Sequence, residues 1–186
     1  MRDLIHELIP HAPHMGLYVA PNIPADKLHN ALRDYAPSMQ PGEVVALYDG
    51  TLMGSAKDGA VFASDRFVFQ NTDLEPPHEV RYEEVVHVEK KSGLLKGKKV
   101  FLEVNRGRAT FALKLDVSAR PEAMAYLYRF LHEAMLLPAE PVSEPPPGAR
   151  TAAGTDLHAV RQALGTLRAQ GLLAEVDYQR LLNALG

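Results

Sequence analysis

Apolar and polar residues alternate in two segments of residues 86–115, on either side of a short turn. Alternation with a period of two is typical of β-strands that bury one face. With Arg106-Gly107 as a two-residue turn, every strongly apolar side chain of this hairpin except Phe101 falls on one face. The opposed residues are then Val104 and Ala109, Leu102 and Phe111, and Val100 and Leu113. This pattern predicts a sheet with one buried face and one solvated face.

The choice of turn also decides which charges meet on the outer face of the hairpin. A three-residue turn would oppose Val104 to Arg108 and mix the faces, so the two-residue turn is preferred. In that register Lys99 lies opposite Lys114. Such a like-charge pair costs roughly a few tenths of a kcal/mol unless an anion lies beside it.

Composition limits the classes of protein to which the chain can belong. A length of 186 residues, with 46% hydrophobic and 23% charged residues, indicates one globular domain and an appendage. The net charge of −3 argues against a general nucleic-acid binder, and the absence of cysteine excludes disulfides and cysteine-based zinc sites. No apolar run approaches the ~18 residues of a membrane span, and the N-terminus lacks the apolar core of a signal peptide. We therefore expect a soluble, cytoplasmic protein, with peripheral attachment to a membrane as an alternative.

Residues 1–42 are predicted to be an N-terminal helical extension. Residues 2–9 have helical apolar spacing, Pro10 ends that helix, and residues 10–22 form an extended connector. A second helix is predicted to begin near Pro24. Its apolar stripe is Leu28, Ala31, Leu32 and Tyr35.

Residues 43–137 are predicted to hold seven short strands followed by one helix. The first five strands are placed at residues 43–50, 60–64, 66–70, 79–82 and 85–90, and the hairpin above supplies the last two. The helix is expected over residues 120–136, with Ser118 as its N-cap and Pro121 in its first turn.

The remaining residues are predicted to form a linker and a pair of helices. Residues 138–154 are rich in proline, alanine and glycine and lack apolar periodicity. Residues 155–186 have two helical apolar faces that are too small to be stable alone, so they should dock on the domain or on copies of themselves. The predicted oligomerisation or docking residues are Leu157, Val160, Leu164, Leu167, Leu172, Leu173, Val176, Tyr178, Leu181, Leu182 and Leu185.

Two stretches of the predicted domain resemble a known family. LYDGTLMGSAKDGAVFASDRFVFQN, with its Lys-Asp-Gly and Ser-Asp-Arg turns, and RYEEVVHVE are similar to bacterial pleckstrin-homology-like (PH-like) and GRAM-like domains. The resemblance covers residues 43–136. It implies an α+β fold, a seven-stranded antiparallel barrel or sandwich capped by a C-terminal helix, and its motifs are structural rather than catalytic.

The last 32 residues resemble the SHOCT element, a two-helix module appended to bacterial proteins. The shared features are the leucines, Gly171, the acidic Glu175 and Asp177, and Tyr178. Ala174 replaces the serine or threonine that usually precedes the second helix, so a cap worth about 1 kcal/mol is missing. The resemblance implies a role in oligomerisation or interaction.

Charge is strongly polarised along the predicted sheet domain. Residues 43–89 carry three basic and ten acidic side chains, a balance of −7, whereas residues 90–114 have a balance of +7. The basic residues are Lys90, Lys91, Lys96, Lys98, Lys99, Arg106, Arg108 and Lys114. They are predicted either to bind anionic headgroups or an acidic protein, or to form a solvated edge that prevents aggregation. Phe101, beside Ala112 on the outer face, would be covered by the helix near Pro24 or by a partner.

No pattern of catalytic or metal-binding residues stands out. His6, His11, His14 and His29 match no metal-ligand spacing, and the chain has no glycine-rich phosphate loop, nucleophile elbow or zinc helix motif. We expect no enzyme, metal or cofactor. The chain is predicted to be an interaction or adaptor protein. The alternative is a peripheral membrane protein that binds anionic lipid through residues 90–114.

Overall fold

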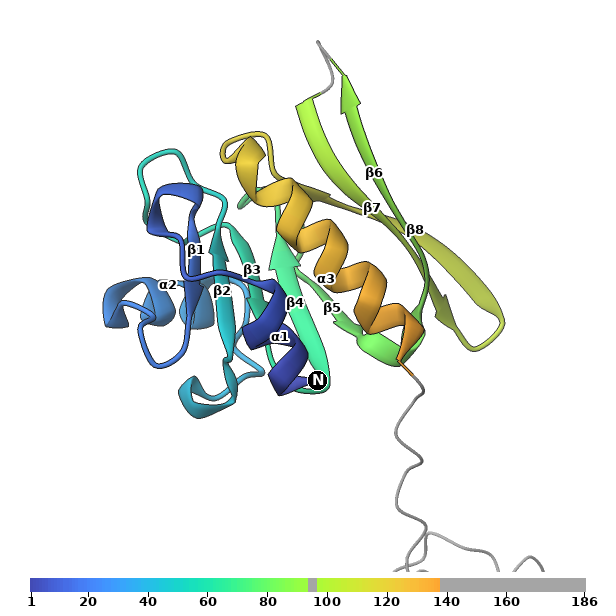
Figure 1. Cartoon of the computed structure of the whole chain (residues 1–186), viewed down its shortest axis with the longest axis horizontal. Helices are drawn as coiled ribbons and strands as arrows, with labels where there is room; N and C mark the ends of the chain where they lie inside the picture. Colours follow the sequence, from blue (N-terminus) through green and yellow to red (C-terminus); the bar gives the residue numbers. More distant parts are fainter. Residues whose placement is uncertain (94–96, 138–186) are drawn as a thin grey trace, which may run out of the picture. The chain divides into compact units, whose positions relative to one another are not determined.

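The structure is a computed structural model that describes residues 1–93 and 97–137 (Figure 1). The chain divides into two units, Met1–Leu137 and Pro138–Gly186, and the described residues belong to the first. The predicted linker, residues 138–154, and the predicted helical pair, residues 155–186, lie outside the described residues.

The first unit consists of two antiparallel sheets and three α-helices in its described part. The five-stranded sheet has the order β1 (Leu17–Val19), β2 (Ala46–Asp49), β3 (Gly59–Phe62), β4 (Arg66–Gln70) and β5 (His78–Arg81). The three-stranded sheet has the order β6 (Val85–Gly93), β7 (Gly97–Arg106) and β8 (Ala109–Asp116). The α-helices are α1 (Arg2–Leu8), α2 (Ala25–Asp34) and α3 (Met124–Leu136). Short 3-10 helices are η1 (Pro13–Met15), η2 (Pro41–Glu43), η3 (Tyr82–Glu84) and η4 (Pro121–Ala123).

The predicted α+β class, with antiparallel strands and a C-terminal helix, is confirmed. The strands, however, form sheets of five and three strands, and the described residues form no closed barrel. The strand beyond the predicted seven is β1, which lies in the stretch predicted as a connector. Leu17 pairs with Tyr48 and Val19 with Ala46, so the N-terminal residues extend the sheet.

The five-stranded sheet is covered on both faces. On one face, aromatic rings of β3 and β4 pack together with rings of η3 and α3. The ring centroids of Phe62 and Phe130 lie 5.5 Å apart, and those of Tyr82 and Phe130 lie 5.7 Å apart. On the other face, Ala31 and Tyr35 at the end of α2 join a second apolar cluster. All four residues of β2 and of β3 are buried. This explains why these strands are nearly continuous apolar runs in the sequence.

The predicted stripe of α2 faces the sheet, but it does not cover Phe101. Ala31 and Tyr35 are buried, and Leu28 and Leu32 are packed partly buried against the same cluster. The helix lies against β3 and η2 of the five-stranded sheet. Phe101 belongs to the other sheet, so the prediction that this helix covers Phe101 is wrong.

The predicted register of the last hairpin is wrong by two residues. Val104 pairs with Phe111 and Arg106 with Ala109, so the turn is Gly107-Arg108. Gly107 has φ +65°, and glycine at the first central position is what a type II′ turn requires. A shift of two residues preserves the faces, and Val100, Leu102 and Val104 are buried as expected. It changes every cross-strand pair: Lys99 lies opposite Asp116, not Lys114.

Ser118 does not cap α3 as predicted. A 3-10 turn at Pro121–Ala123 precedes the helix, whose N-cap is Ala123 without a side-chain hydrogen bond. The Ser118 hydroxyl instead accepts a hydrogen bond from the backbone N–H of Lys98, at 3.0 Å. It thereby ties the start of β7 to the segment that leads into α3.

A buried ion pair joins α2 to the loop between β2 and β3. The Lys27 Nζ lies 2.7 Å from Asp49 Oδ2, and these side chains are 14% and 1% exposed. Burial opposes the charged form of Lys27, but its hydrogen bond and attraction to Asp49 outweigh that effect and raise the pKa of the ammonium. Asp49 Oδ1 accepts the backbone N–H groups of Thr51 and Ala56, and Lys27 also donates to the Gly54 carbonyl. The pair therefore organises the whole loop.

We predict that Lys27→Met will lower the free energy of unfolding by about 3 kcal/mol, because it leaves the Asp49 carboxylate buried without its cation. Urea denaturation of the full chain, followed by circular dichroism, measures this change. The control is Arg33→Met, which removes a cation of the same helix whose side chain is 54% exposed and forms an ion pair with the adjacent Asp34. Arg33→Met should change stability by less than about 0.5 kcal/mol. Equal effects of the two variants would contradict the importance assigned to the buried pair.

Candidate binding surface on the three-stranded sheet

The eight basic residues predicted as one surface are divided among three places. Lys91, Lys99 and Lys114 lie on the outer face of the three-stranded sheet, together with Phe101. Lys90 and Lys98 share the opposite face with the buried Val100. Arg106 and Arg108 lie at the other end of β7, at the turn into β8. Lys96 is outside the described residues.

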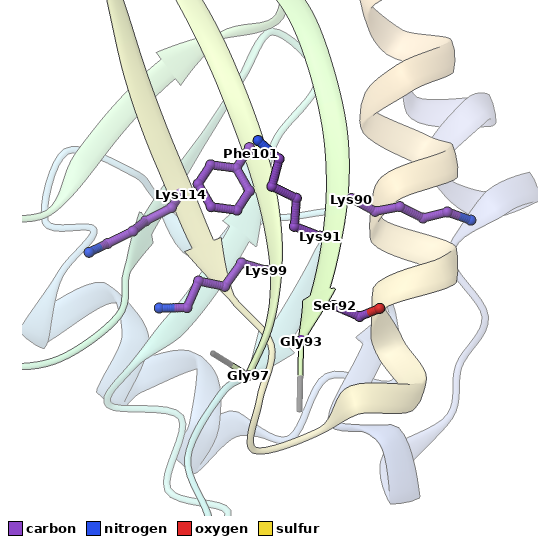
Figure 2. Close-up of a pocket in the computed structure, with 8 residues that line it drawn as sticks. All are labelled: Lys90, Lys91, Ser92, Gly93, Gly97, Lys99, Phe101 and Lys114. Carbon is purple, nitrogen blue, oxygen red and sulfur yellow. The ribbon is translucent and has the colours of Figure 1, made fainter. Parts of the chain in front are cut away.

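Phe101 forms the centre of the outer-face cluster. Its ring lies 4.7 Å from the Lys91 Nζ, and its backbone pairs with Lys114 on the next strand. Figure 2 shows Lys91, Lys99, Phe101 and Lys114 on one side of the sheet. An open hollow of about 860 Å³ is lined by these side chains together with Lys90, Ser92, Gly93 and Gly97. We call Lys91, Lys99, Phe101 and Lys114 the outer-face cluster.

Each lysine of the outer-face cluster has an acidic neighbour. Their Nζ atoms lie 2.9 Å, 3.1 Å and 3.9 Å from carboxylate oxygens, in the pairs Lys91–Glu89, Lys99–Asp116 and Lys114–Glu75. All three acids come from outside residues 90–114: Glu75 and Glu89 precede that segment, and Asp116 follows it. The three lysines of the outer-face cluster are therefore compensated in space, and the outer face is mixed in charge rather than uniformly basic.

Asp116 is the most constrained of these acids. Its Oδ1 accepts the Ser118 N–H at 2.9 Å, and its Oδ2 lies 3.1 Å from the Lys99 Nζ. Burial alone would raise the pKa of Asp116, but the bonds from Ser118 and the attraction of Lys99 outweigh burial and lower that pKa. The predicted like-charge pair of Lys99 and Lys114 is thus replaced by an attractive pair that fixes Lys99.

Lys90 and Arg106 have structural partners elsewhere. The Lys90 Nζ lies 5.0 Å from the ring centroid of Tyr128 on α3, as its direction in Figure 2 indicates. The Arg106 guanidinium lies 3.4 Å from a Glu84 carboxylate oxygen and donates to the Glu79 carbonyl, which ties the end of β7 to β5. Arg108 is exposed in the turn and forms no ion pair with the described residues.

Sequence patterns missed the residues that complete this surface. Asn71, in the loop after β4, donates its side-chain amide to the Lys114 carbonyl and accepts the Asp116 N–H, at 3.0 Å and 2.8 Å. No local pattern marks this asparagine as a partner of β8, 43 residues away. If Gly107 is placed first in the turn, the register of the hairpin puts Asp116 opposite Lys99, so the sequence could have predicted this partner.

Other kinds of site receive no support from the described residues. Within residues 1–93 and 97–137, no group of three or more histidine, cysteine, aspartate or glutamate side chains is arranged to hold a metal ion. In the same part of the chain, no helix is long and apolar enough to cross a membrane. The predicted docking leucines, from Leu157 to Leu185, lie outside the described residues.

Comparison of the chain with protein-family models, curated proteins and solved structures finds no match. The PH-like and SHOCT resemblances therefore rest on the residue patterns quoted above and stay predictions. The described residues form an α+β unit with two antiparallel sheets and a C-terminal helix.

We predict that Asp116→Asn will lower the free energy of unfolding by about 0.5–1 kcal/mol at pH 7, because the partly exposed pair with Lys99 loses its charge. The native pKa of Asp116 is lowered, so its stabilisation is present above the unfolded-state pKa and is lost as the pH falls through the native value. The difference between variant and parent should therefore shrink in urea titrations below about pH 4. Glu103→Gln on the same face is the control. A difference that is unchanged at acid pH would contradict the ionic origin of the effect.

Proposed function

We propose that this chain is a non-enzymatic interaction protein whose first unit binds an acidic partner protein through the outer-face cluster. The observation that supports the proposal is the position of Phe101, partly exposed among three lysine side chains on a solvated sheet face. Aromatic side chains surrounded by polar groups supply much of the binding energy at protein interfaces. Lysine ammonium groups beside the ring would orient carboxylates of the partner.

The compensated charge favours a protein partner over a membrane. Anionic membranes attract basic residues by about 1 kcal/mol each when those residues form a net positive surface. Here Glu89, Asp116 and Glu75 each lie beside one lysine, which weakens attraction at a distance. A partner protein that buries Phe101 can instead place its own carboxylates beside the lysines at short range, where they replace these acids.

The predicted C-terminal helical pair would add self-association or docking. Its leucine-lined faces bury too little area alone, and linked copies would convert weak contacts of the first unit into firm attachment. This part of the proposal rests on the sequence of residues 155–186.

The first test uses Lys91→Gln/Phe101→Ala in the full chain. Partners captured from the native cell by the parent chain are identified, purified and titrated against both proteins by calorimetry. We expect at least about tenfold weaker binding for the double variant, because it loses the aromatic contact and one ammonium. The control, Lys57→Gln/Leu74→Ala, removes one ammonium and truncates one large apolar side chain at exposed residues elsewhere, and it should bind like the parent.

Sedimentation with anionic vesicles at low and high salt separates the membrane alternative. If the parent chain and the control bind vesicles at low salt while the double variant does not, the outer-face cluster binds anionic lipid. That result would overturn the protein-partner proposal. Equal partner binding by parent and double variant would overturn the role of the outer-face cluster.

Self-association is tested by light scattering on the full chain and on residues 1–137, the first compact unit. We expect the full chain to have a larger mass than its monomer, and the shorter chain to be monomeric, because it lacks the predicted helices. If both are monomeric, self-association through residues 155–186 is wrong.

A further inference from the structure

No described segment pairs with the edge of β8 over the half of the strand next to the turn. In the order β6–β7–β8, only one side of β8 is paired within the described residues. The Lys114 carbonyl and the Asp116 N–H point away from β7, because both bond to Asn71. Backbone groups alternate in direction along a strand. Those of Thr110 and Ala112 therefore also point outward, and no described residue beyond the β7 pairing bonds to them.

Asn71 sets one limit of this open edge and the turn sets the other. The Asn71 side chain imitates a neighbouring strand at Lys114 and Asp116, so pairing there is already satisfied. The turn at Gly107-Arg108 ends the strand on the other side. Residues 109–112 between these limits are all exposed. The edge is thus long enough for a short stretch of added strand.

The side chains beside this edge differ on its two faces. On the inner face Phe111 is 49% exposed, because α3 packs against β6 and β7 and leaves this end of β8 uncovered. In Figure 1 the β7–β8 turn projects past the end of α3. On the outer face the small side chains of Thr110 and Ala112 lie between Lys114 and the turn that contains Arg108.

We propose that residues 109–112 of β8 accept an extended segment of a partner protein as a ninth strand. Strand addition of this kind takes its affinity from main-chain hydrogen bonds and its specificity from alternate side chains. The added strand would carry apolar residues facing Phe111 and acidic residues facing Lys114 and Arg108, since cross-strand and diagonal neighbours interact. The proposal rests on the proposed function only in taking the partner to be a protein.

A second copy of the chain fits this edge poorly. Antiparallel self-pairing about Phe111 would place Arg108 opposite Lys114 of the copy, a like-charge contact. Pairing about Ala112 would bring Arg108 of the copy to Asp116, where Asn71 already occupies the edge. The basic residues at both limits favour an acidic strand instead.

The probe is a synthetic peptide, acetyl-Gly-Glu-Val-Glu-Val-Glu-Val-Gly-amide, titrated into the isotope-labelled full chain and followed by amide NMR. We expect saturable shifts centred on Thr110–Lys114, and none with the peptide in which lysine replaces each glutamate. Ala112→Pro should weaken binding at least about tenfold, because it removes an outward N–H that β7 does not use. Ala112→Ser is its control. Phe111→Ser, at an exposed position, is a second variant that should also weaken binding without depending on proline.

The outcomes separate this proposal from the proposed function. If the peptide still binds Lys91→Gln/Phe101→Ala but no longer binds Ala112→Pro, it binds at the β8 edge. This result supports the edge whether or not the outer-face cluster binds a partner. The reverse result overturns the edge and favours that cluster. Absence of edge shifts with the acidic peptide also overturns it. Two further results would show that something other than a partner strand occupies the edge, and each would overturn the proposal. The first is a dimer of the chain that Ala112→Pro dissociates. The second is protection of the Thr110 and Ala112 amides from hydrogen exchange in the isolated full chain.

Discussion

Burial of β2 and β3 on both faces is the constraint on which the first unit depends. A sheet that has no solvated face over its central strands needs a cover on each side and a neighbour at each edge. Residues 1–42 supply three of these requirements: α2 covers one face, α1 joins the core on the other, and β1 pairs with β2. The Asp49 carboxylate at the end of β2 is compatible with burial because Lys27 reaches it from α2.

The three-stranded sheet follows the opposite rule, and this difference locates the candidate surfaces. Its inner face packs on α3, while its outer face meets solvent and carries the outer-face cluster. The solvated face of a one-sided sheet can carry several exposed ion pairs and a partly exposed ring without covering them. The outer-face cluster and the open edge of β8 both belong to this less constrained sheet, and they adjoin one another at Lys114.

Local patterns predicted the faces of the strands but not their partners. The period of two places Val100, Leu102 and Val104 in the core, and any shift by an even number of residues keeps them there. Turn chemistry contained the missing information, because a type II′ turn places glycine first, as Gly107 is. β1 has only three residues, Leu17–Val19, which is too short for a periodic signal. The charge block of residues 90–114 was visible in the sequence, but Glu75 and Asp116 reach it only through the tertiary fold.

The two hydrogen bonds of Asn71 affect how readily this protein aggregates while it folds. A single loop side chain shortens the unpaired part of β8, so it limits how much backbone is available to other chains during synthesis. An aliphatic residue at this position would leave the core intact yet expose the Lys114 carbonyl and the Asp116 N–H as well. The longer edge would then adjoin the uncovered Phe111 ring, a combination that promotes aggregation. We therefore expect the solubility of the folded unit to depend on Asn71, a residue that contributes to neither apolar cluster.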